Sequence, residues 1–184
     1  MIIKVALSNH HVHLTREALD ILFGKDYELT VKRPLLQKGQ FAAEETVTLV
    51  KNNKTLEHIR IVGPVRSYTQ VELLDLDNEY FGINAPVRQS GDLEGSESID
   101  IIGPNGTYHA VESTIISNTH IHMSADDLVT FNKTNNEVVS VICNNQRIDD
   151  VHIKSDDTCV LEMHMNKDIA EKLNIETGME VTIC

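Results

Sequence analysis

Two histidine pairs of the form His-x-His have the residue types and spacing best suited to chemistry in this sequence. The first is His11 and His13 in SNHHVHLT, and the second is His120 and His122 in SNTHIHMS. In a β-strand, residues i and i+2 point to the same face, so the two imidazoles of each pair can converge on one ion. Imidazole is a common zinc ligand, and a catalytic zinc site usually has three protein ligands. The sequence therefore predicts two metal sites, each completed by a third ligand from elsewhere in the chain.

A candidate for the third ligand follows each histidine pair. Glu72 alternates with apolar residues in QVELL, and His164 does the same in EMHMN. We therefore predict two zinc-binding triads, which are His11, His13 and Glu72 for one ion and His120, His122 and His164 for the other. If the parts of the chain that carry these triads pack face to face, the two ions form one dinuclear site.

The two histidine pairs also have matching surroundings. Each pair follows a strand-like apolar run and Ser-Asn, and each precedes an apolar residue and a hydroxyl residue, Thr15 or Ser124. These hydroxyl residues can cap a short helix. Because several features repeat in the same order, the sequence indicates an internal duplication. We expect two similar domains, residues 1–90 and residues 91–184, with an approximate boundary because the chain can cross between them.

Short runs of apolar and β-branched residues dominate the chain and predict a mainly β fold with short helices. They are IIKVAL, ETVTLV, HIRIVGPV, SIDIIG, EVVSVIC, VHIKS, TCVLEMHM and MEVTIC, and turn signals such as GPNG and CNNQR separate them. Strand pairs joined by tight turns close into β-barrels or β-sandwiches. Capping and stop signals predict three helices, over residues 15–24, 124–131 and 166–178.

The composition is that of a globular protein, and it excludes several classes of partner. The 184 residues are 41% hydrophobic and 24% charged, and the formal net charge is −12. This charge argues against a general binder of nucleic acid or of an anionic membrane, which needs a positive surface. The three cysteines show no Cys-x-x-Cys spacing, and the N-terminal apolar run is too short for a signal peptide or a membrane span. We therefore expect a cytoplasmic protein with reduced thiols.

Positively charged residues near turns are candidates for binding a small anion. Arg66 lies in a Gly-Pro turn six residues before Glu72, and Arg88 follows the same Pro-Val sequence in APVRQSGD. Arginine can hold phosphate or carboxylate through two parallel hydrogen bonds. Lys38 lies in the basic, turn-rich segment KRPLLQKGQF, which could hold a polyphosphate ligand or be a solvated loop. The sequence has no glycine-rich phosphate loop and no Gly-x-Ser-x-Gly element, so nothing indicates a covalent serine mechanism.

Another motif favours a different class of protein. HVHLTREALDILFG has the spacing of the cupin metal motif, with Glu17 as a third ligand and Gly24 as the final glycine. A cupin needs Glu17 on a strand beside His11 and His13, whereas the sequence predicts a helix there. The alternative functions that stay open are a cupin-like or other metal-dependent hydrolase or dioxygenase, and a non-catalytic protein that binds metal or coenzyme A.

Six segments follow one another over nearly the whole chain, namely SNHHVHLT, LLQKGQFAAEETV, GPVRSYTQVEL, GINAPVRQSGD, THIHMS and LEMHM. Together they resemble the PduL-type phosphate propanoyltransferase family, also called phosphotransacylases. The resemblance implies two closely packed β-barrel domains with a two-zinc site between them. It also implies an enzyme that reversibly transfers a short acyl group between coenzyme A and inorganic phosphate, giving acyl phosphate. Carried over motif by motif, the two triads hold the zinc ions, and Arg66 is the catalytic residue that binds phosphate.

Two positions depart from the pattern of this family. Arginine usually precedes each His-x-His pair there, whereas His10 and Thr119 occupy these positions here. The departure implies weaker or altered binding of phosphate or coenzyme A, and we do not predict His10 as a ligand. The chain starts directly at its first strand, without the N-terminal helix that targets some family members to microcompartments. We therefore expect a free cytoplasmic enzyme that takes acetyl-CoA or propanoyl-CoA, and a homo-oligomer is compatible with the sequence.

Overall fold

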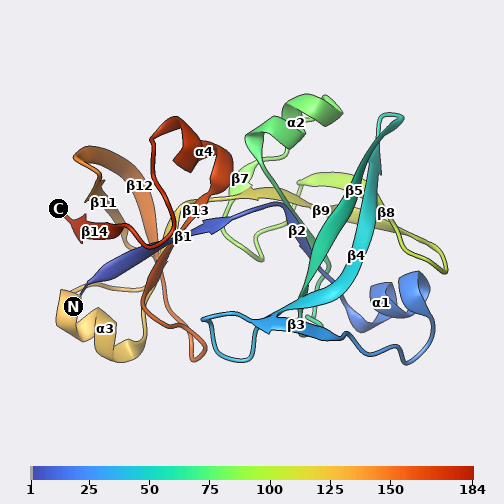
Figure 1. The fold of residues 1–184 in the computed structure, drawn as a ribbon, viewed down its shortest axis with the longest axis horizontal. Coiled ribbons are helices and arrows are strands. Elements are labelled where there is room, and N and C mark those ends of the chain that lie inside the picture. The colour runs from blue at the N-terminus through green and yellow to red at the C-terminus, as the bar shows by residue number, and fades with distance from the viewer. Residues whose placement is uncertain (1) are drawn as a thin grey trace. The chain divides into compact units, whose positions relative to one another are not determined.

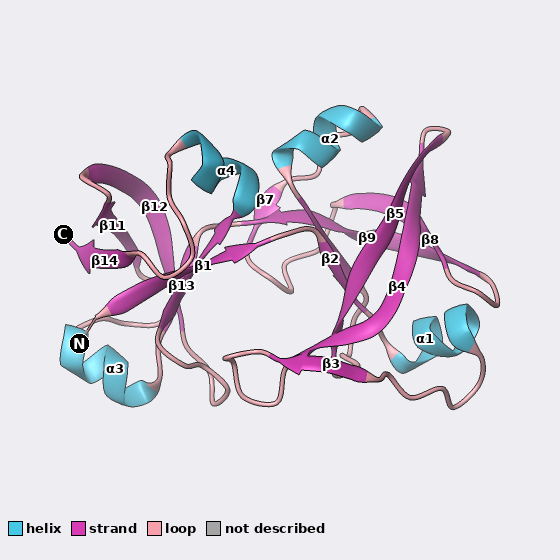
Figure 2. Ribbon diagram, in the orientation of Figure 1, coloured by secondary structure: helices cyan, strands magenta, loops and turns pink. Residues whose placement is uncertain are grey.

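Strands supply most of the regular structure in the computed structural model, which describes residues 2–184 (Figure 2). The strands are β1 (Ile3–Ser8), β2 (His11–His13), β3 (Val31–Pro34), β4 (Phe41–Lys51), β5 (Lys54–Gly63), β6 (Gln70–Leu73), β7 (Val87–Arg88), β8 (Glu97–Ile102), β9 (Thr107–Ser117), β10 (His120–His122), β11 (Val138–Cys143), β12 (Gln146–Lys154), β13 (Glu162–Asn166) and β14 (Glu180–Ile183). The helices are α1 (Arg16–Phe23), α2 (Asp75–Phe81), α3 (Ala125–Phe131) and α4 (Lys167–Lys172). The predicted mainly β fold with short helices is confirmed. None of the helices that residues 2–184 form has the length and apolar character needed to cross a membrane.

The strands close into two six-stranded β-barrels. One barrel has the order β1-β13-β10-β12-β11-β14, and pairing of β14 with β1 closes it. The other has the order β4-β5-β2-β6-β9-β8, and pairing of β8 with β4 closes it, while β3 extends from β4 and β7 from β9. The strand pattern left barrels and sandwiches open. The structure confirms the barrels that the family resemblance implies.

Each barrel belongs to a compact unit built from segments that are separated in the sequence. The first unit consists of residues 2–9, 36–38 and 118–184, and the second unit consists of residues 10–35 and 39–117. The halves 1–90 and 91–184 describe a duplication of the sequence, and that duplication stays a prediction.

The N-terminal strand β1 belongs to the barrel of the first unit. It runs parallel to β13, with Val5 opposite Met163, and Figure 1 shows the blue β1 beside the red β13. Its other neighbour is β14, with Ile3 opposite Val181. The chain therefore contributes its first strand to a barrel whose other strands all come from residues 118–184.

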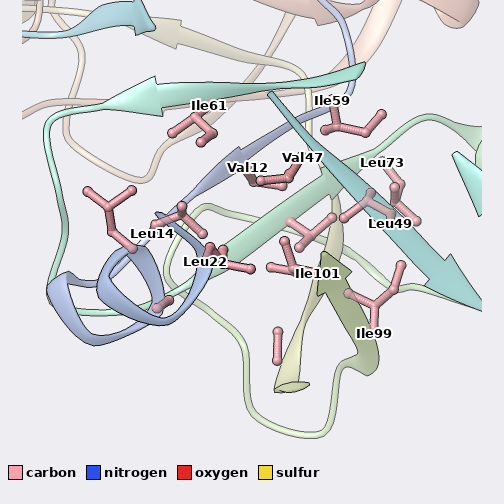
Figure 3. Packing of buried hydrophobic residues seen from close by; sticks show 14 of the residues in the cluster. Val12, Leu14, Leu22, Val47, Leu49, Ile59, Ile61, Leu73, Ile99 and Ile101 are labelled. Atoms are coloured by element: carbon pink, nitrogen blue, oxygen red, sulfur yellow. The ribbon is translucent and has the colours of Figure 1, made fainter. Parts of the chain in front are cut away.

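Aliphatic side chains form a separate core in each barrel, as expected for a chain without Trp. In the second unit, Val12 packs in one cluster with Leu22, Leu49 and Ile101, and all four are fully buried (Figure 3). The core of the first unit includes Ile3, Val5, Ile121, Ile153, Met163 and Met165. Val12 and Ile121 are the middle residues of the two His-x-His pairs, and each points into its core. Because neighbouring residues of a strand point to opposite faces, the flanking histidines are directed away from the core.

The two helices that follow the histidine pairs begin and end as predicted. Thr15 caps α1, where its side chain accepts a hydrogen bond from the N–H of Ala18, and Gly24 follows the last residue of the helix. Ser124 caps α3 in a capping box, since its Oγ accepts from the N–H of Asp127 and the Asp127 carboxylate accepts from the N–H of Ser124. The cap therefore fixes where each helix starts in the sequence after its His-x-His strand.

The other two helices differ from the sequence predictions. Helix α4 ends at Lys172 instead of continuing towards Gly178, because Asn174 has a left-handed backbone with φ of 52°. Gly178 belongs to the loop that follows, where its N–H donates to the carbonyl of Val5. Helix α2 was not predicted because its first turn lacks a hydroxyl cap. The carboxylate of Asp77 instead accepts the N–H of Leu74 at 2.9 Å.

Candidate metal centres

Each histidine pair occupies a three-residue strand with the same neighbours in its own barrel. Strand β2 pairs in parallel with β5 and antiparallel with β6, and β10 pairs in parallel with β12 and antiparallel with β13. The register places His11 opposite Glu72 and His120 opposite His164. The structure thereby brings together both of the predicted triads. In each triad, one ligand atom from every residue lies within 4.8 Å of the other two.

The first triad lies in the second unit and presents two histidine nitrogens and a carboxylate to one point. Nε2 of His11 lies 3.1 Å from Nε2 of His13, and each of these nitrogens lies 3.6 Å from an oxygen of Glu72. Nδ1 of His13 donates to the carbonyl of Val62 at 3.0 Å, so Nε2 is the nitrogen without a proton. Burial lowers the pKa of His13 to about 4 and keeps its imidazole neutral. A neutral imidazole with its Nδ1 proton held in this way is ready to bind a metal.

The second triad lies in the first unit, and its hydrogen bonds fix both members of the histidine pair in the same tautomer. Nδ1 of His120 donates to the carbonyl of Asn118 at 2.8 Å. Nδ1 of His122 lies 3.2 Å from the Sγ of Cys159, whose thiol donates to the carbonyl of Lys154. Burial raises the pKa of the Cys159 thiol, so it keeps its proton and its Sγ accepts from His122. These contacts through Nδ1 leave Nε2 as the ring atom that each histidine can offer to a metal, and the two Nε2 atoms lie 3.1 Å apart.

These donor sets fit zinc in both chemistry and spacing. A tetrahedral zinc ion with Zn–N bonds of about 2.0–2.1 Å separates neighbouring ligand atoms by about 3.3 Å. The Nε2–Nε2 distance is 3.1 Å in both pairs, and the nitrogen–carboxylate distances of the first triad are 3.6 Å. Occupation by zinc stays a prediction.

The third residue of the second triad, His164, is held by a carboxylate on its own strand. Its Nε2 lies 2.8 Å from Oε2 of Glu162, which the register places opposite His122. Its ring centroid lies 4.6 Å from that of His122 and 5.3 Å from that of His120. A carboxylate that accepts the ring proton is a usual outer partner of a metal-binding histidine.

Arg66 is joined to the first triad by a chain of hydrogen bonds. Its backbone N–H donates to the carbonyl of Leu14 at 2.8 Å, which fixes the turn after β5. Its Nη1 lies 3.4 Å from the Oγ of Ser90, which also accepts from Nε2 of Gln70 at 2.9 Å. The same Nε2 donates to Oε1 of Glu72 at 2.6 Å. The predicted anion-binding residue therefore lies in one network with a predicted metal ligand.

The other two cationic candidates lie in different surroundings. Arg88 belongs to the second unit, and its Nη1 donates to Asp92 at 2.8 Å and to the carbonyl of Glu94 at 3.1 Å. Lys38 belongs to the first unit, where its side chain is exposed and its N–H donates to the carbonyl of Thr158. A role of either residue in binding coenzyme A or phosphate stays a prediction.

The cupin-like interpretation is wrong. Glu17, which it requires as a ligand, lies exposed on helix α1, and the carboxylate that joins His11 and His13 is that of Glu72. His10 is likewise separate from the triads, as predicted, because its Nδ1 lies 3.0 Å from Oδ2 of Asp77 at the start of α2.

Sequence reasoning missed the residues that support the ligands. They are Gln70, Ser90, Cys159 and Glu162. Gln70 and Glu162 each precede a third ligand by two residues, and this spacing places them on the same face of a strand. That signal could have found them. Cys159 lies 37 residues after His122, and nothing in the sequence connects the two.

Comparison with known proteins identifies the family. A family model described as phosphate propanoyltransferase matches residues 4–176. The chain belongs to the phosphate propanoyltransferase family. A relative of this name from Thermotoga maritima is 44% identical over 180 residues, which make up 96% of this chain and 86% of the relative. Two further phosphate propanoyltransferases, from Lachnoclostridium phytofermentans and Shewanella putrefaciens, are both 41% identical, cover 98% and 97% of this chain, and are each covered over 86% of their own length.

Membership of the phosphate propanoyltransferase family makes this chain a phosphate acyltransferase. The matched range takes in all strands of the second unit and most of the barrel of the first unit, ending before β14, and it includes all six triad residues together with Arg66. The resemblance stated from the sequence motifs is therefore confirmed.

Proposed function

We propose that this chain transfers a short acyl group, acetyl or propanoyl, reversibly between coenzyme A and inorganic phosphate. In this proposal each chain holds two zinc ions, one on each triad. The observation that carries the proposal is that each of two three-residue donor sets converges on a point of its own, and that one of these sets is connected to Arg66 through Ser90 and Gln70. Family membership supports the transfer between coenzyme A and phosphate.

Zinc held by these residues supplies a Lewis acid for the thioester carbonyl and a favourable partner for the departing thiolate. The protein's part is to keep the ligating nitrogens unprotonated and directed at one point. The carbonyls of Val62 and Asn118 and the thiol of Cys159 achieve this by accepting hydrogen bonds from the Nδ1–H groups. The ligands are thereby oriented before any ion or substrate arrives.

Arg66 binds the phosphate in this proposal. The chain carries a formal net charge of −12, so an anionic substrate needs a local positive group. The guanidinium of Arg66 is half-buried, and its backbone is tied to the residue that follows the first histidine pair through the carbonyl of Leu14. A fixed guanidinium can hold phosphate for attack and offset the negative charge that develops on the carbonyl oxygen.

The transfer is direct in this proposal. A phosphate oxygen attacks the thioester carbonyl carbon, a C–O bond forms, the C–S bond breaks, and coenzyme A leaves as the thiolate. An acyl-enzyme needs an activated nucleophile, and burial raises the pKa of the thiols of both Cys143 and Cys159. Thiols that keep their protons in this way are poor nucleophiles.

The deciding experiment follows release of coenzyme A from acetyl-, propanoyl- and butanoyl-CoA, with and without inorganic phosphate. We expect release to require phosphate and to produce acyl phosphate in equal amount, and the three rates report the preferred acyl chain. Release at the same rate without phosphate contradicts the proposal in favour of a thioester hydrolase. Zinc binding without any turnover contradicts it in favour of a binding protein.

A further inference from the structure

Gln70 is a buried amide that connects several parts of the candidate site. Its side chain is fully buried on β6, directly opposite His13. Nε2 donates to Glu72 at 2.6 Å and to Ser90 at 2.9 Å, and Oε1 accepts from the N–H of Gly91 at 2.8 Å. We propose that Gln70 is the positioning residue that sets the metal-binding carboxylate of Glu72 and the phosphate-binding guanidinium of Arg66 together. This inference rests on the proposed function and adds a residue to it.

The hydrogen bond from Gln70 to Glu72 orients the carboxylate of Glu72. A carboxylate can rotate about its last bond, and each rotation changes which oxygen faces an ion. The amide of Gln70 holds Oε1, while Oε1 faces His13 and Oε2 faces His11 at 3.6 Å each. Because an amide donor is neutral, it fixes the carboxylate without cancelling its negative charge. Outer partners of this kind tune metal affinity.

The hydrogen bond from Gln70 to Ser90 connects Gln70 to Arg66, because Ser90 lies on a turn beside the guanidinium. The Oγ of Ser90 accepts from Gln70 and lies 3.4 Å from Nη1 of Arg66, so one hydroxyl lies between the amide and the guanidinium. Oε1 of Gln70 also holds the next residue, Gly91, whose φ of 95° lies in the region that favours glycine. The two bonds to neighbouring residues fix the turn against β6. Loss of the amide therefore releases both the turn and the guanidinium that it orients.

The barrel of the first unit uses the equivalent position in the same way. Glu162 lies opposite His122, as Gln70 lies opposite His13, and each precedes the third ligand by two residues. Oε2 of Glu162 lies 2.8 Å from Nε2 of His164. Gln70 and Glu162 differ in type because their ligands differ. A carboxylate ligand needs a hydrogen-bond donor, which Gln70 supplies, and an imidazole ligand needs an acceptor, which Glu162 supplies. This correspondence indicates that the position serves the ligand in both barrels.

The test replaces Gln70 by methionine, which has a similar volume but no donor. We expect Gln70→Met to weaken zinc binding at the first triad roughly 10- to 100-fold. It should also raise the KM for phosphate more than it lowers kcat. Zinc affinity is measured without substrate, by competition with a chromogenic chelator, so it does not depend on activity. The matched control is Gln146→Met, which removes another hydrogen-bonded glutamine whose amide donates to the carbonyl of Leu173, and it should change neither quantity.

Variants of Ser90 separate the effect of Gln70 on Arg66 from its effect on Glu72. Ser90→Ala should raise the KM for phosphate and leave zinc affinity unchanged, and Ser90→Thr, which keeps the Oγ atom, should restore the KM. These variants also test the connection from Gln70 through Ser90 to Arg66 if Gln70→Met does not fold. Wild-type zinc affinity and wild-type phosphate KM in folded Gln70→Met overturn the inference, as does an unchanged KM in Ser90→Ala. A wild-type protein that binds no zinc or needs no phosphate refutes the proposed function instead, whatever the variants do.

Discussion

The Sγ of Cys159 lies 3.2 Å from Nδ1 of His122, and this buried thiol accepts a hydrogen bond from the N–H that the imidazole must carry there if its Nε2 is to bind a metal. The thiol in turn donates to the carbonyl of Lys154 and accepts from the N–H of Asp156. The expected role of Cys159 is therefore to orient the imidazole of His122. We expect it to act neither as a nucleophile nor as a metal ligand.

Replacement of Cys159 should weaken metal binding at the second triad only. We expect Cys159→Ala to lower zinc affinity there about 10-fold, because the ring of His122 loses the acceptor that selects its tautomer. Cys159→Ser supplies an oxygen acceptor and should recover most of the affinity. Cys143→Ala is the matched control, since Cys143 is buried in the same unit and belongs to its core cluster. Equal zinc affinity in the two alanine variants would falsify this role.

Removal of one histidine pair should remove one zinc ion. The double variant His120→Ala/His122→Ala should bind one ion per chain instead of two, and His11→Ala/His13→Ala should do the same, because each triad keeps a single donor. Metal content is measured by atomic emission on protein that has been freed of loosely bound ions. His109→Ala/His152→Ala, which removes two histidines outside the triads, should keep both ions. A double variant of either pair that still binds two ions contradicts the assignment.

Loss of Arg66 should affect phosphate and spare the metal. A hydrogen bond to a charged group contributes about 1.5–3 kcal/mol, so we expect Arg66→Ala to lower kcat/KM for phosphate roughly 10- to 100-fold. The zinc content should stay at two ions, since the hydrogen bonds that connect Arg66 to the first triad run through Ser90 and Gln70. Arg147→Ala is the control, because the side chain of Arg147 is 61% exposed and pairs with Asp149. A wild-type phosphate dependence in Arg66→Ala excludes this residue as the phosphate binder.

Adjacent isoleucines of β8 should differ sharply in their effect on stability. Ile101 is fully buried in the core of the second unit, whereas Ile102 is 39% exposed, because neighbouring residues of a strand point to opposite faces. We expect Ile101→Ala to lower the free energy of unfolding by about 2–5 kcal/mol, the usual cost of such a cavity. Ile102→Ala should cost about 1 kcal/mol or less. Urea unfolding followed by circular dichroism measures both, and similar losses in the two variants would show that the strand register is wrong.

The candidate ligands could be predicted from the sequence because their geometry is local. The imidazoles of His11 and His13 are two residues apart, and two residues is the side-chain period of a strand. Glu72 and His164 could be assigned because each alternates with apolar neighbours, which marks the polar face of a strand. The caps of α1 and α3 are equally local, since each depends on a hydroxyl and an amide three residues apart.

The parts that could not be predicted depend on register between distant strands or on unusual local signals. The contact of Gln70 with Ser90 joins residues 20 apart, and that of His122 with Cys159 joins residues 37 apart. Only the end of the long strand β9, directly before the second histidine pair, was recognised, because polar residues such as Glu112 and Ser113 interrupt its apolar alternation. Glu112 also has a positive φ of 42°, which marks an irregularity inside the strand.

The placement of β1 has a consequence for the order in which the chain can fold during its synthesis. Every strand of the second unit lies between residues 10 and 117, so that barrel can close while later residues are still being added. Strand β1 is synthesised before the second unit, yet both of its partners, β13 and β14, are synthesised after it. Its edges stay unpaired while the whole second unit is being made, which is the condition under which strands pair with a wrong neighbour. The most vulnerable segment of the nascent chain is therefore the one that leads directly into the first histidine pair.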